Sequence, residues 1–188
     1  MANSNAPFGL RPVRHYSGGC VRANAYQIAG GYTSNIFRGD PVKSVGTNKR
    51  IAVAAATNTM RGVFDGCEYV DTNGEIKFSH HWPANQAIKT GSVVTAFVWD
   101  DPMILFEAQM SLLFAETDIG NVADLTFATA GSTLTGNSGC AVDSAALGSA
   151  GISIIDYVRE ASNVVGNYTR VLIMLNEHEL GHGAMTGV

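Results

Sequence analysis

The sequence predicts a mainly β fold: an antiparallel sandwich or barrel behind an extended N-terminal arm, with at most one or two short helices. Short apolar or alternating runs recur at a spacing of roughly 8–12 residues, which is typical of such folds. Turn-forming residues separate these runs, and no stretch sustains the i, i+3, i+4 spacing of a long helix. A chain of 188 residues can bury a core without disulfides. We therefore expect an arm over residues 1–24 and a single β-rich domain over residues 25–188.

The arm is predicted from residues 1–24, which are rich in Gly, Pro, Asn and Arg and show no periodicity. Pro7, Gly9 and Pro12 oppose a stable helix there, as does the Gly18-Gly19 pair. We expect this segment to become ordered by lying on another surface.

The body is predicted from the runs that follow the arm. The expected strands are 25–29, 40–45, 50–55, 62–70, 75–82, 92–99, 103–109, 152–159 and 168–176, with another near 140–143. The best short-helix candidate is 118–125, with Asp118 as N-cap, although Gly120 lies inside it. Residues 128–151 are rich in small side chains and predict a long loop. The last strand is apolar on both faces, which predicts a central or doubly covered position.

The clearest turn is Asn73-Gly74, which favours a type I′ hairpin with a two-residue loop. That loop would place Tyr69 opposite Phe78 and Cys67 opposite His80. Because strand side chains alternate, one face of the hairpin would then be apolar. This predicted core face comprises Val63, Cys67, Tyr69, Ile76, Phe78 and Trp82.

Charge is sparse and unevenly distributed. The net charge is −4 and charged residues make up 15% of the chain. Residues 1–50 hold seven Lys or Arg against Asp40 alone, a balance of +6. Residues 51–188 hold the other five basic and fifteen acidic residues, a balance of −10. This asymmetry indicates a basic leading segment that meets an acidic partner or the acidic body of a second copy, or else two solvated surfaces.

The cysteines and the N-terminus restrict the class of protein further. Cys20, Cys67 and Cys140 are odd in number and widely spaced, which opposes a disulfide framework or a zinc knuckle. The first residues lack the apolar stretch of a signal peptide, and no run approaches the length of a membrane helix. We expect a soluble protein made in the cytoplasm.

The sharpest catalytic pattern is His178-Glu179-Leu180-Gly181-His182, which matches H-E-x-x-H. On a helix, the two histidines would bind zinc and Glu179 would act as general base. Nearby glycines oppose a helix, and no third His, Asp, Glu or Cys follows His182. We expect the end of a surface strand, and keep a zinc hydrolase as an alternative. No glycine-rich phosphate loop and no Ser/His/Asp constellation is recognisable in the sequence.

Several blocks resemble the small virion structural proteins of tailed bacteriophages. They are APFGLRPVRH at 6–15, FRGDPV at 37–42, GVFDGCEY at 62–69, FSHHWP at 78–83, DDP at 100–102 and LFEAQ at 105–109. Proteins of this kind decorate or cement the outer face of the capsid. The resemblance implies a jelly-roll-like domain that assembles as a dimer or trimer over the seams between major capsid protein subunits.

Together these patterns predict a non-enzymatic capsid decoration protein of the virion. We expect a homotrimer more than a dimer, the major capsid protein as partner, and no cofactor, nucleic acid or membrane. The expected contact residues in the arm are Phe8, Arg11, Arg14, His15 and Arg22. A third reading is a β-sandwich virion protein that binds a host receptor or glycan.

Overall fold

The computed structural model confirms a mainly β fold with antiparallel sheets, and it describes residues 3–56, 58–148 and 151–181. The first sheet runs in the order β1 (Arg11–His15), β10 (Ile104–Gln109), β14 (Arg170–Leu175), β13 (Ile152–Tyr157), β11 (Val122–Thr126) and β12 (Ala141–Leu147). The second runs β2 (Asn24–Ile28), β9 (Val94–Trp99), β6 (Gly62–Val70), β4 (Pro41–Ser44) and β5 (Ile51–Val53), with β7 (Ile76–Ser79) also paired to β6. A two-stranded sheet joins β3 (Ile36–Phe37) and β8 (His81–Trp82).

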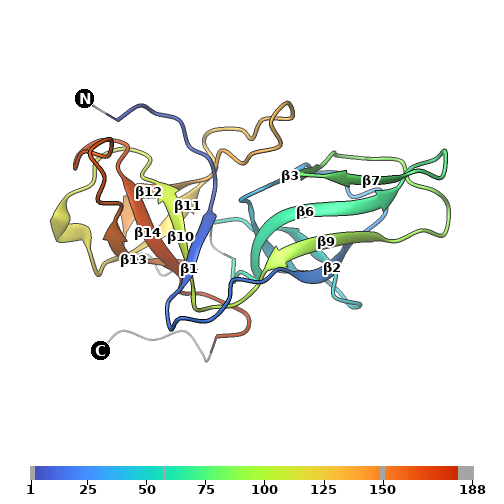
Figure 1. Cartoon of the computed structure of the whole chain (residues 1–188), viewed down its shortest axis with the longest axis horizontal. Helices are drawn as coiled ribbons and strands as arrows, with labels where there is room; N and C mark the ends of the chain where they lie inside the picture. The colour runs from blue at the N-terminus through green and yellow to red at the C-terminus, as the bar shows by residue number, and fades with distance from the viewer. Residues whose placement is uncertain (1–2, 57, 149–150, 182–188) are drawn as a thin grey trace.

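The two large sheets lie at opposite ends of the longest axis (Figure 1). Each sheet buries its own apolar cluster, one centred on residues such as Phe106 and Ile173, the other on Phe64 and Trp82. The first cluster also takes in Trp99, from the end of β9 in the second sheet. The halves are therefore joined by buried contacts as well as by the chain.

The N-terminal segment, which we expected to become ordered on another surface, lies through β1 on the chain's own first sheet. Strand β1 pairs antiparallel with β10, and Leu10 just before it is 1% exposed. The backbone N–H of Gly9 also donates to the carbonyl of Cys140. Pro12 is tolerated because β1 is an edge strand, and the register shifts after it.

The helix expected over 118–125 is wrong. Only Glu116–Asp118 form a 3₁₀ turn, η1, and Val122–Thr126 form strand β11. Gly120 has a φ of +90°, which ends any helical path between them. Ala123 and Leu125 are buried while their neighbours are not, so burial alternates with the two-residue period of a strand rather than the 3.6-residue period of a helix.

The predicted β6–β7 hairpin forms, but its register is wrong by one residue. Tyr69 lies opposite Lys77 instead of Phe78, and Val70 lies opposite Ile76. The loop has three residues, 72–74, because the N–H of Asp71 pairs with the carbonyl of Glu75 and only Gly74 has positive φ. A shift of one residue reverses every side chain of a strand. Ile76 and Phe78 are consequently exposed, at 62% and 74%, while Trp82 is buried as expected.

The long loop before β12 bridges the two halves of the molecule (Figure 1). Backbone hydrogen bonds join Arg38 to Gly136 and Ser138, both at 2.9 Å. At Gly131 a Cβ atom would lie 2.2 Å from the Phe37 ring, so only glycine permits this approach. Strand β14 is central, between β10 and β13, as its apolar sequence predicted.

Candidate functional site

The arginines predicted as contact residues are exposed on β1 and the loop after it. Arg11, Arg14 and Arg22 are all exposed, and none takes part in an ion pair within the described part of the chain. Val13 and Tyr16 lie between them in sequence and are 50% and 55% exposed. We call Arg11, Val13, Arg14, Tyr16 and Arg22 the basic strip. Arg and Tyr are enriched at protein-binding surfaces.

His15, another of the predicted contact residues, is partly buried and takes part in hydrogen bonds within the chain. Its Nε2 lies 3.2 Å from Asp101 Oδ2, and its Nδ1 lies 3.1 Å from Ser17 Oγ. This is a hydrogen-bonded Ser-His-Asp series, which sequence reasoning missed because Asp101 is distant in the chain. However, the backbone N–H groups of Ser17 and Gly19 also donate to Nδ1. A nitrogen that already accepts these donors is poorly placed to take a proton from Ser17 Oγ, so His15 holds the turn that follows β1.

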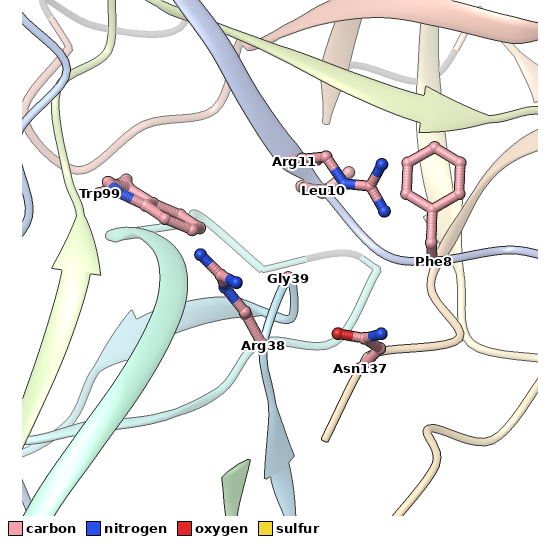
Figure 2. Close-up of a pocket in the computed structure, with 7 residues that line it drawn as sticks. All are labelled: Phe8, Leu10, Arg11, Arg38, Gly39, Trp99 and Asn137. Atoms are coloured by element: carbon pink, nitrogen blue, oxygen red, sulfur yellow. The ribbon is translucent and has the colours of Figure 1, made fainter. Parts of the chain in front are cut away.

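Phe8 and Arg11 line a cleft of about 310 Å³ together with residues from three other segments (Figure 2). The full lining is Phe8, Leu10, Arg11, Arg38, Gly39, Trp99 and Asn137. The Arg11 guanidinium lies 4.4 Å from the Phe8 ring centroid, and that of Arg38 lies 5.6 Å from the Trp99 ring. Sequence reasoning missed Arg38, Trp99 and Asn137 as site residues, because only the fold brings them to residues 8–11.

A buried carboxyl group follows two lining residues of this cleft, Arg38 and Gly39, in the chain. Asp40 is 6% exposed and accepts hydrogen bonds from Phe37 N at 2.8 Å and Ser138 Oγ at 2.5 Å. Ser138 Oγ in turn accepts from Cys140 N. Burial raises the pKa of Asp40, although both of its hydrogen bonds oppose that shift. This series fixes the Arg38-Gly39 turn against the long loop.

The H-E-x-x-H segment is taken up by structural contacts. Glu179 accepts hydrogen bonds from Ser44 N and Ser44 Oγ, at 2.7 and 2.5 Å, and lies 3.7 Å from Arg61 Nη1. His178 pairs with Met60 in an isolated β-bridge, which is not a helix, and it is 6% exposed. The expected surface position of His178 is therefore wrong. His182 lies outside the described residues.

The protonation of His178 also matters for metal binding. Its Nδ1 accepts from Leu180 N at 3.0 Å, so in the neutral ring the proton is on Nε2. Nε2 is buried and has no hydrogen-bond partner among the described residues, and a protonated nitrogen has no lone pair for a metal. Burial lowers the pKa of His178, and the charge of Arg61 adds to that effect. Within the ranges that the structure describes, no three His, Cys, Asp or Glu residues are grouped as metal ligands.

By fold and surface, this chain is an antiparallel β protein with a basic edge strand and a two-arginine cleft. Comparison with protein-family models, curated proteins and solved structures found no match. Among the described residues, none of the helices is long and apolar enough to cross a membrane.

Proposed function

We propose that this chain is a non-enzymatic virion structural protein that decorates and cements the outer face of a phage capsid. It would bind across seams between major capsid protein subunits, with the basic strip as its contact surface. The resemblance of several sequence blocks to such proteins supports this proposal. A jelly-roll-like architecture, as in those proteins, is part of it.

The observation that carries the proposal is the unpaired state of the basic strip. Arg11, Arg14 and Arg22 are exposed and have no carboxylate partner in the described chain. A charge that is not neutralised internally attracts and orients an acidic partner. Val13 and Tyr16, which lie between those arginines in the sequence, add exposed apolar area, and Tyr and Arg are enriched where protein surfaces bind.

We propose that the protein acts as a homo-oligomer, with a trimer favoured over a dimer. The body is acidic and the leading segment basic, so the two can attract each other between copies. Repetition on a symmetric shell multiplies weak contacts without requiring a strong single site. The mass of the purified protein by light scattering tests this part, and a monomer at working concentration would contradict it.

Capsid retention tests the basic strip directly. In the triple variant R11Q/R14Q/R22Q, occupancy on purified capsids should fall at least about tenfold, because charged contacts set association and orientation. R50Q removes an exposed arginine outside the strip and is the matched control. If the triple variant decorates capsids to full occupancy, the strip is not the contact surface. A particle reconstruction with this chain on the tail would favour receptor binding instead.

A further inference from the structure

We propose that the cleft lined by Arg11 and Arg38 receives an acidic peptide segment of a partner protein, whose carboxylates pair with the two guanidinium groups. This inference rests on the proposed function for the identity of the partner, but not for the chemistry of the cleft. It goes beyond the basic strip by assigning a concave binding site to Arg38, Trp99 and Asn137.

The first argument for an acidic ligand is the charge of the residues that line the cleft. Two arginines line the cleft and no carboxylate does. Arg11 forms no ion pair within the described chain. Arg38 donates its Nε–H to Asp65 Oδ1 at 2.9 Å, and its two terminal nitrogens have no hydrogen-bond partner among the described residues, so they remain for a ligand. The cleft therefore offers several charge-assisted donors, and Asn137 adds an amide.

The second step is that these donors are held in place before any ligand arrives. Each guanidinium lies over an aromatic ring, Arg11 over Phe8 and Arg38 over Trp99 (Figure 2). The N–H of Leu10 donates to the carbonyl of Gly39 at 2.9 Å, which joins the two segments that carry the arginines. Groups that are already ordered lose less conformational entropy when they bind.

The close approach of these segments depends on glycine. Gly39 has a φ of +91°, and a Cβ atom there would lie 3.0 Å from Leu10 N. Gly9 has a φ of +77°, and a Cβ atom there would lie 2.6 Å from Ser138 Cβ. The backbone conformation that brings Arg11 and Arg38 to one cleft is thus specified locally by two residues without side chains.

The ligand chemistry follows from the shape of the groups and the charge of the chain. A guanidinium presents paired N–H groups that match the two oxygens of a carboxylate. The aromatic rings provide apolar walls for the aliphatic stem of a glutamate. Both arginines lie within residues 1–50, which carry a balance of +6, so an anionic segment is attracted to this part of the chain. These features favour an acidic protein segment.

The cleft can be tested without any capsid. We would titrate 15N-labelled protein with the peptide acetyl-Gly-Gly-Glu-Glu-Gly-Gly-amide and follow the Arg side-chain Nε–H signals and the Trp99 indole signal. We expect saturable shifts that the Gln-Gln peptide does not produce. R11Q/R38Q should weaken the binding at least about tenfold, whereas R50Q should not. Equal shifts with inorganic phosphate, or unchanged binding by R11Q/R38Q, would overturn the assignment.

Capsid binding by the same variants separates this inference from the proposed function. If the parent protein binds capsids and R11Q/R38Q binds them equally well, the cleft inference fails while the function stands. If the parent protein binds the peptide through the two arginines but never binds capsids, the function fails while the cleft stands. As a control, a thermal unfolding midpoint of R11Q/R38Q equal to that of the parent protein would show that the variant keeps the fold.

Discussion

At the scale of single residues, buried polar groups fix the places where separate segments meet. Asp40 illustrates this, because its carboxylate accepts from Phe37 N in β3 and from Ser138 Oγ in the long loop before β12. Replacing the carboxylate by a methyl group would leave both donors unsatisfied in a dry site. Each unsatisfied buried group costs roughly 1–3 kcal/mol.

Asp40→Ala should therefore lower the free energy of unfolding by about 2–6 kcal/mol. Urea unfolding followed by circular dichroism measures this loss. Asp65→Ala is a suitable comparison, because Asp65 is partly exposed and its one ion pair is at the surface, where such pairs contribute about 0–1 kcal/mol. A loss at Asp40 no larger than at Asp65 would contradict the bridging role.

His178 gives the fold a predictable response to acid. Its folded-state pKa is lowered, first by burial and then by Arg61, so the unfolded chain binds the proton more tightly. Stability is then fully present above the ordinary histidine pKa of about 6.5 and is lost as the pH falls through the folded-state value. One proton can contribute a slope of at most about 1.4 kcal/mol per pH unit.

His178→Asn removes this titration while keeping an acceptor for Leu180 N. Between pH 7 and 5 its free energy of unfolding should fall less steeply than that of the parent. Some slope should remain, because burial also lowers the pKa of His81. Urea unfolding at a series of pH values measures both slopes, and parallel slopes would mean that His178 stays solvated.

At the scale of elements, the β6–β7 hairpin provides the sharpest prediction. Phe78 is 74% exposed, whereas the predicted register would have buried it beside Tyr69. Phe78→Ala should change the free energy of unfolding by about 0.5 kcal/mol or less, as exposed substitutions do. Phe64→Ala, at a buried position of the paired strand, should cost about 3–5 kcal/mol. Equal losses of unfolding free energy at both positions would support the two-residue loop and contradict the observed register.

The hairpin also shows which information the sequence holds at this scale. The alternation of apolar and polar residues predicted most of the body strands, because a half-buried strand shows this period of two directly in its sequence. It could not locate β1, β3 or β11, which are short or contain proline or polar residues. The register failed because Asn-Gly fits a two-residue loop, whereas hydrogen bonds from Asn73 N and Glu75 N to the Asp71 side chain stabilise a three-residue one.

The candidate site was predictable only where its residues are neighbours in the chain. Phe8 and Arg11 were found from the arm's composition. Arg38, Trp99 and Asn137 reach the cleft through the turn after β3, the end of β9 and the long loop, and strand order is not encoded in periodicity.

At the scale of the whole molecule, the N-terminal segment is part of the fold rather than an appendage. Strand β1 covers the edge of β10, and Leu10 belongs to the first apolar cluster. Loss of a buried leucine side chain alone costs about 2–5 kcal/mol. An uncovered strand edge also offers unpaired backbone groups to other chains.

Two truncations distinguish an integral strand from a detachable arm. A chain that begins at Phe8 keeps Leu10 and β1, so its thermal midpoint should stay close to that of the full chain. It loses the Asn3 contacts to Val164 and Asn167 and two hydrogen bonds of Gln109, one from Ala6 N and one to the carbonyl of Ser4. A chain that begins at Ala25 lacks β1 and should unfold at a much lower temperature or aggregate. Calorimetry compares them, and equal midpoints would mean that residues 8–24 can leave the sheet freely, as a detachable capsid-binding arm would require.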